Sequence, residues 1–231
     1  MQIFPLNDFG MIILNLSINK VGIQNMKIGI IDYGAGNIGS VMQAFKAAGS
    51  ELERVSDADK LKDYDKVVLP GVGAFGNAID HLRSSCLDEA ILDFTKSGKC
   101  FFGVCVGMQL LFEEGLEFGK HQGLGIFKGT VKRFDEKKLQ PLKIPHIGWN
   151  QCKKKKDSPL LRDFEDDFYL YFVHSFHAVI EKSDEDCVVA SCVYGYEFPA
   201  IIQKENIFGI QPHPEKSDKN GLRILENFLK I

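Results

Sequence analysis

The chain has 231 residues and a formal net charge of −3, with 45% hydrophobic and 26% charged residues. Its length is sufficient for one domain with a sizeable core, and its charge gives no electrostatic reason to expect binding to nucleic acid or an anionic membrane. The six cysteines form no C-x-x-C pair and no cluster with zinc-ligand spacing, which favours a reducing cytoplasm without a metal site.

The first predicted element is a strand over residues 28–32, a run of apolar β-formers without alternation, as is typical of a central parallel strand. A glycine-rich turn over residues 33–37 and a helix over residues 38–48 follow. The turn lacks the full dinucleotide-binding spacing and a P-loop lysine, so it predicts no phosphate site.

A second buried strand is predicted over residues 66–69, before a helix over residues 74–82. Between them lies Pro70-Gly71-Val72-Gly73, at the end of a strand where doubly wound sheets bind their ligands. Its glycines would let the backbone N–H of Val72 point at a developing oxyanion. The simpler alternative is a turn that only starts the next helix.

The most informative stretch predicts a strand over residues 101–104, the pattern Gly103-x-Cys105-x-Gly107, and an apolar helix opening over residues 108–112. This is the cysteine version of the G-x-S-x-G nucleophile elbow. Glycines are needed because the sharp turn would make side chains clash, and the helix N-terminus favours a thiolate. The alternative is a buried cysteine between two packing glycines.

A candidate base follows a later apolar strand, where His213 precedes Glu215 by two residues. A cysteine nucleophile needs such a base, and the base needs a group that orients it. Before this point, Glu113, Glu114 and Glu117 are predicted on the tail of the elbow helix, where surface charge is the default interpretation.

The region over residues 123–206 is predicted to be rich in strands: 129–134, 168–173, 187–194 and 200–203. The basic run over residues 153–156 is interpreted as a solvated turn, and Trp149 as either a core aromatic or part of a surface patch. His174 and His177 are expected on opposite faces of one strand, which is poor metal-site geometry.

The last predicted element is an amphipathic helix over residues 222–229. Strands alternate with helices in the first half and dominate the middle. This order predicts an α/β fold, a three-layer sandwich with a flavodoxin-like, mostly parallel central sheet.

The order Cys105, His213, Glu215 resembles the class I glutamine amidotransferases, and the segments around them carry that resemblance. Further segments make the chain similar to the glutaminase subunits of imidazole glycerol phosphate synthase, from histidine biosynthesis: 32–37, 69–75, 145–150 and 171–176. The resemblance runs from about Met26 to Ile231. It departs from the usual pattern at Val106, where leucine is usual, and at Pro212, where an aromatic residue is usual.

The resemblance implies hydrolysis of L-glutamine to glutamate and ammonia without metal or organic cofactor, with Cys105 as nucleophile, His213 as base and Glu215 as its orienting group. The backbone N–H groups of Val72 and Val106 would hold the oxyanion. The implied substrate contacts are Gly73, Gln109, Glu117, Ser175 and Phe176. The implied partner is a synthase (cyclase) subunit in a heterodimer, contacted by Asn37, His146, Trp149, Asn150 and Lys216.

Three rival interpretations come from other classes. A catalytically dead scaffold is disfavoured by the complete Cys105, His213 and Glu215 set. A cysteine peptidase of similar fold would release no glutamate from free glutamine. A related glutaminase that supplies ammonia to a sugar amidotransferase in surface glycan synthesis cannot be separated by one sequence.

Residues 1–25 precede the resemblance. Their apolar run lacks the flanks of a signal peptide and is too short to span a bilayer. We therefore expect a domain over residues 26–231, preceded by an extension upstream of the true start at Met26. The alternative is a genuine extension, disordered or packed as an extra strand.

Overall fold

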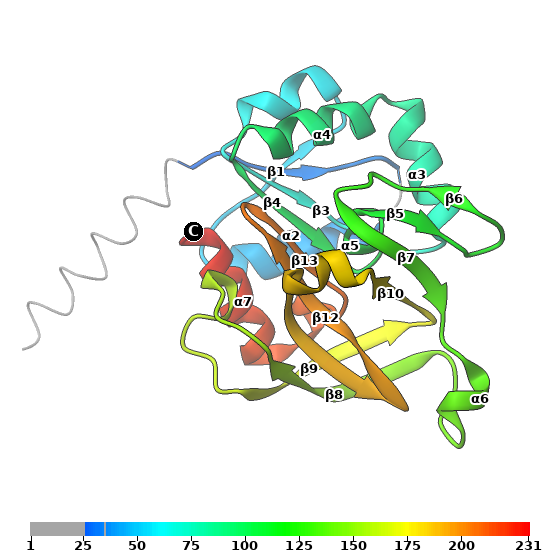
Figure 1. Cartoon of the computed structure of the whole chain (residues 1–231). Helices are drawn as coiled ribbons and strands as arrows, with labels where there is room; N and C mark the ends of the chain where they lie inside the picture. Colours follow the sequence, from blue (N-terminus) through cyan, green and yellow to red (C-terminus); the bar gives the residue numbers. More distant parts are fainter. Residues whose placement is uncertain (1–25, 35) are drawn as a thin grey trace, which may run out of the picture.

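The computed structural model describes residues 26–34 and 36–231 (Figure 1). The expectation of an extension over residues 1–25 lies outside this range. Within the described residues, no helix is long and apolar enough to cross a membrane.

In the described residues, nine strands form a central sheet in the order β2-β1-β3-β4-β13-β12-β11-β8-β9. Their bounds are β1 (Ile28–Ile31), β2 (Glu53–Val55), β3 (Lys66–Leu69), β4 (Cys100–Val104), β8 (His146–Lys154), β9 (Asp167–His174), β11 (Val188–Tyr194), β12 (Tyr196–Lys204) and β13 (Ile207–Ile210). A second sheet has the order β10-β7-β5-β6, with bounds β5 (Phe112–Gly115), β6 (His121–Gln122), β7 (Phe127–Arg133) and β10 (Phe176–Ile180).

The helices connect and cover these strands. The α-helices are α2 (Ile38–Ala47), α3 (Phe75–Ser84), α4 (Leu87–Lys96), α5 (Val106–Gln109), α6 (Glu136–Leu139) and α7 (Asp218–Leu229). The 3-10 helices are η1 (Ala58–Asp63), η2 (Pro159–Leu161), η3 (Lys182–Cys187) and η4 (Pro214–Lys216).

The central sheet has a parallel half and an antiparallel half. The strands β2, β1, β3, β4 and β13 pair in parallel, in the order 2-1-3-4-5 of flavodoxin-like folds. From β13 onward each pairing is antiparallel. The burial follows this division, because β3 is buried throughout whereas β9 alternates between buried and exposed positions. The α/β class and the flavodoxin-like core are confirmed.

Two adjacent aromatic residues of β4 show how helices cover both faces of the parallel half. The Phe101 ring lies 6.5 Å from that of Phe94 in α4, whereas the Phe102 ring stacks 5.0 Å from Phe228 in α7. Successive strand side chains point to opposite faces, so α4 and α7 lie on opposite sides of the sheet. Phe45 of α2 contacts Phe228 on the α7 side, which completes the three layers seen in Figure 1.

The helix after the elbow is much shorter than predicted. It ends at Gln109, and the chain becomes strand β5 at Phe112, so Glu113 and Glu114 lie on a strand rather than on a helix tail. The helix ends because backbone N–H groups of another segment bind the carbonyl groups that a longer helix would use. The carbonyl of Leu110 accepts from Leu124 N, and that of Leu111 accepts from Ile126 N, so the apolar run joins the second sheet.

Strands β8 and β10 were not predicted from the sequence. Strand β8 includes Trp149, and Lys153 and Lys154 form its end instead of a turn. His174 ends β9, while His177 lies in β10, so they do not share one strand. Both imidazole rings pack against Phe134, at 5.2 and 4.6 Å between centroids.

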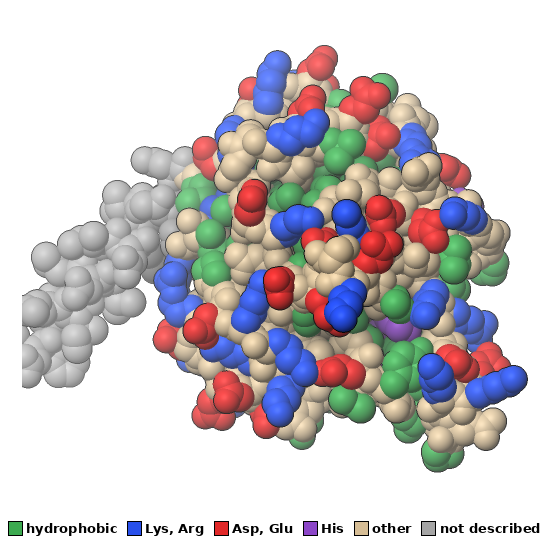
Figure 2. Space-filling view, in the orientation of Figure 1, with side chains coloured by type: hydrophobic (Ala, Val, Ile, Leu, Met, Phe, Trp, Pro, Cys, Tyr) green, Lys and Arg blue, Asp and Glu red, His purple; other side chains and the backbone are tan. Residues whose placement is uncertain are grey.

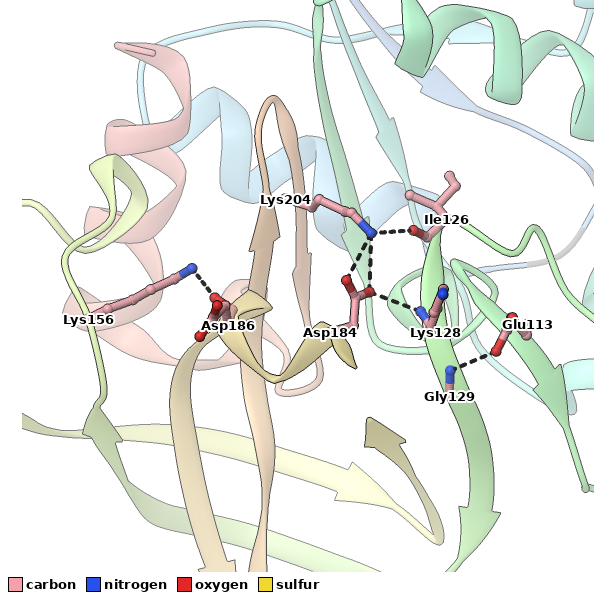
Figure 3. Close-up of polar contacts among 8 residues, drawn as sticks. All are labelled: Glu113, Ile126, Lys128, Gly129, Lys156, Asp184, Asp186 and Lys204. Atoms are coloured by element: carbon pink, nitrogen blue, oxygen red, sulfur yellow. Dashed lines mark hydrogen bonds and ion pairs between the residues drawn. The ribbon is translucent and has the colours of Figure 1, made fainter. Parts of the chain in front are cut away.

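Polar contacts around η3 connect the central sheet with the second sheet (Figure 3). The Asp184 carboxylate accepts from Lys204 Nζ of β12 at 2.9 Å and from the backbone N–H of Lys128 in β7 at 3.0 Å. Lys156 donates to the Asp186 carbonyl on the other side of η3. On the face seen in Figure 2, positive and negative side chains are interspersed, without a large area of one sign.

Candidate active site

A pocket of about 490 Å³ lies at the carboxyl ends of the central parallel strands. It brings together most of the residues that the sequence singled out. Its lining includes Asn37, Val72, Gly73, Cys105, Val106, Gln109, Glu117, Ser175, Phe176, His213, Glu215 and Lys216. Trp149, Asn150 and His146 lie outside this pocket, on β8.

The elbow holds Cys105 in a strained conformation with φ 54° and ψ −112°. Its backbone N–H donates to the carbonyl of Ile210 at 2.8 Å, which ties the turn to strand β13. A Cβ on Gly107 would lie 2.0 Å from the Leu69 carbonyl oxygen, and one on Gly103 would lie 2.7 Å from the Gly107 carbonyl oxygen. Both glycines are therefore required by backbone approach, as the sequence predicted.

The candidate base and its carboxylate are in direct contact. His213 Nδ1 lies 2.7 Å from Glu215 Oε1, and both side chains are buried. The backbone N–H of His213 donates to the Tyr171 carbonyl, and its own carbonyl accepts from Ser217 Oγ. Pro212, which departs from the usual family pattern, is buried in this segment and leaves these bonds intact.

The charge of the site keeps His213 protonated. Burial lowers its pKa, but hydrogen bonds to Cys105 and Glu215 and their negative charges raise the pKa of His213 to about 10. The second carboxylate oxygen of Glu215 is buried and has no hydrogen-bond partner among the described residues. Next to Cys105 and the Glu215 carboxylate, this imidazole is therefore stable as an imidazolium.

The loop after β3 reaches the same pocket. Val72 is 40% exposed, and Gly73 has φ +87°. Behind it, the Tyr33 hydroxyl donates to the Pro70 carbonyl at 3.1 Å, and burial, helped by the charge of Cys105, raises the pKa of Tyr33 well above its usual range. The loop therefore has a fixed base and an accessible end next to the N-terminus of α5.

The five predicted substrate contacts all line the pocket. The side chain of Gln109 is buried, and its Nε2 donates to the Phe176 carbonyl at 3.1 Å. The Glu117 carboxylate accepts from the backbone N–H of Phe75 at 2.9 Å. It therefore lies at the N-terminus of α3, where a negative charge is favoured.

The five predicted partner contacts occupy different environments. Asn37 and Lys216 are at the rim of the pocket, and Trp149 is 52% exposed on β8. His146 is only 2% exposed, so a partner could not touch its ring directly. Its imidazole instead lies next to Asn150, with Asn150 Nδ2 at 3.2 Å from His146 Nε2.

Sequence reasoning assigned no role to Gln211. It is fully buried, and its Nε2 lies 3.7 Å from Cys105 Sγ. The available signal was a polar residue directly after the apolar strand that leads to His213. His174, considered only as a metal ligand, lies at the pocket wall. Among the described residues, no group of three or more His, Cys, Asp or Glu side chains is arranged to hold a metal ion.

A larger hollow of about 820 Å³ lies between η3, β10 and β12. Its lining includes neither Cys105 nor His213. Two of its charged side chains, Lys155 and Glu197, pair with each other, and Ser191 also donates to Glu197. The chemistry described above therefore belongs to the smaller pocket.

A flavodoxin-like sheet with a strained cysteine elbow and a His–Glu pair defines a class of enzymes that use a thiol nucleophile. The family model "Glutamine amidotransferase class-I" matches residues 29–231, so the chain belongs to the class I glutamine amidotransferase family.

The relatives and solved structures agree with this membership. The chain is 48% identical over 205 residues to imidazole glycerol phosphate synthase subunit HisH of Wolinella succinogenes, covering 88% of this chain and 99% of that one. It is 44% identical to the HisH subunit of Bacillus subtilis, over 88% and 96% of the two chains. The PurLQS structure from Thermotoga maritima, 22% identical, matches with a TM-score of 0.70 over 89% and 98% of the chains.

Proposed function

We propose that this chain is the glutaminase subunit of an imidazole glycerol phosphate synthase in histidine biosynthesis. It would hydrolyse L-glutamine and pass the ammonia to a synthase subunit within a heterodimer. The observation that supports this proposal most directly is the contact between His213 and Glu215 beside Cys105. In addition, the chain aligns with nearly the whole length of subunits with that name. We place the protein in a reducing cytoplasm, in keeping with its free cysteines.

The first half of the reaction forms an acyl-enzyme. Cys105 Sγ attacks the side-chain amide carbon of glutamine, which forms a C–S bond and places negative charge on the amide oxygen. The C–N bond then breaks, and His213 supplies a proton to the leaving ammonia. The imidazolium that Glu215 stabilises is the species required at this step.

The second half returns the enzyme to its starting state. A water molecule gives a proton to His213 and attacks the γ-glutamyl thioester, and the C–S bond breaks to release glutamate. The thiolate and imidazolium are then restored. No step needs an electron acceptor, a metal ion or an organic cofactor.

Two backbone N–H groups are the proposed oxyanion donors, from Val72 and from Val106. The residue after an elbow nucleophile normally supplies one donor, and Val106 begins α5 at that position. Loss of one donor typically costs about 10²–10³ in turnover. The accessible Val72-Gly73 end of the loop is the place where such a donor could be switched by a peptide flip.

The pocket also supports recognition of an amino acid. The Glu117 carboxylate supplies a negative charge for the α-ammonium group, while Gln109, Ser175 and Phe176 line the same pocket as Gly73. Its volume of about 490 Å³ exceeds that of a single glutamine, so the mouth can also receive residues of a partner.

Docking of the synthase over this mouth gives ammonia a path that avoids protonation in water. Asn37 and Lys216 at the rim and exposed Trp149 on β8 are the proposed contacts. His146 would act through Asn150. Since uncoupled hydrolysis wastes glutamine, we expect the isolated subunit to hold the loop after β3 in its inactive orientation.

The test is glutaminase turnover measured for the subunit alone, with the synthase subunit, and with the synthase subunit and its nucleotide substrate. We expect a rise of about a hundredfold or more across the series. Full turnover by the isolated chain would contradict the coupling. Growth of a deletion strain without histidine would contradict the pathway and favour the glycan-related alternative.

A further inference from the structure

A buried hydrogen-bond chain begins at the nucleophile. Gln211 is fully buried outside the pocket lining, and its Nε2 is 3.7 Å from the sulfur. The other end of the same amide, Gln211 Oε1, accepts from Gln109 Nε2 at 3.0 Å. Gln109 Nε2 also donates to the carbonyl of Phe176 at 3.1 Å. One fully buried amide therefore contacts both the reacting sulfur and a residue of the substrate pocket.

The chain continues into the antiparallel half of the sheet. His174 Nδ1 lies 2.8 Å from the same Phe176 carbonyl, and His174 Nε2 lies 3.0 Å from His146 Nδ1. His146 Nε2 in turn lies 3.2 Å from Asn150 Nδ2. Asn150 is on β8, next to exposed Trp149.

The carbonyl of Phe176 fixes the direction of every bond in this outer part. A carbonyl only accepts, so His174 must carry its proton on Nδ1 and accept at Nε2. His146 must then donate from Nδ1 and accept at Nε2 from Asn150. Each histidine has one permitted tautomer, so the chain is ordered from Asn150 to Phe176.

The histidines stay neutral, as this order requires. Burial lowers the pKa of His146 to about 4 and that of His174 to about 3. Of the three titratable neighbours that lower the pKa of His174, His146 and His177 are themselves neutral at neutral pH, whereas protonated His213 adds a positive charge that disfavours protonation of His174. The hydrogen-bond order is therefore maintained at neutral pH.

We propose that Gln211 and His174 are positioning residues that hold Cys105 and Gln109 through this buried chain and connect them to Asn150 at the candidate partner surface. The proposal rests on the proposed function, because it concerns the same nucleophile. In the inner part, the Gln211 N–H stabilises the thiolate and its oxygen orients Gln109. In the outer part, displacement of Asn150 shifts His146 and His174 and so the carbonyl that Gln109 shares.

A glutamate substitution separates the two tasks of Gln211. Gln211→Glu keeps an oxygen for Gln109 but places a carboxylate against the sulfur. We expect kcat for glutamine to fall about 10- to 100-fold while KM changes less than about threefold. Gln211→Leu removes both contacts, so its KM should also rise. Gln203→Leu, at a half-buried position near the end of β12, is the matched control and should retain both constants.

Alkylation of Cys105 by iodoacetamide tests the inner part without glutamine, and therefore independently of the proposed function. Each variant is measured against the same variant carrying Cys105→Ala, which removes the signal of the other cysteines. We expect Gln211→Glu to react about tenfold more slowly at neutral pH, with an upward shift in the pH midpoint of its rate. Wild-type alkylation and wild-type kinetics in both Gln211 variants would overturn the inference.

His174→Asn tests the outer part. The asparagine amide can replace Nδ1 as donor to Phe176, but the shorter side chain places no acceptor at the position of Nε2, so the bond from His146 is lost. We expect stimulation of glutaminase turnover by the synthase subunit to fall about fivefold or more, with co-elution of the two subunits in gel filtration retained as proof of a folded complex. Unchanged stimulation would overturn the connection to Asn150, whereas absence of glutaminase activity in the wild type would overturn the proposed function alone.

Discussion

Buried histidines in the two halves of the molecule have opposite acid–base behaviour. His213, after parallel strand β13, has a pKa of about 10. His174 and His177, at the end of β9 and in β10, have pKa values of about 3 and 4. Burial disfavours the charged imidazole in both places, so desolvation alone does not explain the difference.

The difference comes from their partners. His213 faces a thiol and a carboxylate, which favour its protonated form, whereas His174 and His177 contact backbone carbonyls and the ring of Phe134. The reacting site therefore contains a protonated imidazole, that of His213. The buried imidazoles of His174 and His177 are neutral, so their hydrogen bonds keep a fixed direction.

Removing the thiol of Cys105 should have the largest effect on the pKa difference between His213 and the other buried histidines. Cys105→Ala is expected to lower glutaminase turnover by about 10⁴-fold or more and to lower the pKa of His213, while the synthase still works with ammonium salt. Glutamate release and NMR titration of His213 are the measurements. Cys152→Ala, at a buried cysteine of β8 that does not line the active-site pocket, is the matched control. Glutamine-dependent activity in Cys105→Ala would exclude this nucleophile.

Neutralising the carboxylate should come next. Glu215→Gln keeps the size of the side chain but removes the charge at 2.7 Å from His213 Nδ1. Turnover should fall roughly 10²–10⁴-fold, and the pKa of His213 should move down toward those of His174 and His177. A pH–rate profile measures both effects. An unchanged profile would show that Glu215 does not orient the base.

Acid should weaken the neutral histidines. In the folded chain, His146 and His177 stay neutral down to about pH 4, whereas in the unfolded chain they bind protons below about pH 6.5. The unfolded state therefore binds more protons in this window, and the free energy of unfolding should fall by up to about 1.4 kcal/mol per pH unit for each histidine as pH drops.

Denaturant titrations across this window measure that slope. His177→Gln should reduce it, whereas His81→Gln, at an exposed position of α3, should leave it unchanged. His213 contributes with the opposite sign, since its stabilisation is present below about pH 6.5 and is lost as pH rises toward about 10. Equal slopes in the two variants would contradict the neutral state of His177.

A buried lysine gives a smaller, purely structural case. Lys66 Nζ donates to the carbonyls of Phe228 and Leu229 at the end of α7, at 2.7 and 2.9 Å, although burial lowers its pKa. Lys66→Met should reduce the free energy of unfolding by roughly 1–3 kcal/mol, because it leaves carbonyls unpaired, without a change in kcat. Exposed Lys62→Met is the control, and equal stability of the two variants would contradict this role.

The sequence predicted those parts of the fold and site that depend on local pattern. Strand residues 66–69 were predicted to the residue, since the apolar run Val67-Val68-Leu69 before Pro70 has few alternatives. The proximity of Cys105, His213 and Glu215 followed from motif spacing and family resemblance.

The features that could not be predicted from the sequence depend on contacts between segments that lie far apart in the chain. Residues 108–112 are as apolar as a buried helix, but the run pairs with backbone donors of residues 124–127, and the helix stops. Likewise, the role of Gln211 depends on Gln109, and 102 residues separate the two. Neither segment contains a local sequence pattern that predicts its contact with the other.

The pairing of β4 with β13 has a consequence for synthesis of the protein. Cys105 is held by a backbone bond to Ile210, and its base follows on the same late strand. A nascent chain that has released only the first half carries the thiol, but neither the imidazole nor the strand that constrains the elbow. The site is therefore incomplete until β13 and His213 have been synthesised, and a fragment that ends before them lacks both the base and the strand that constrains the elbow.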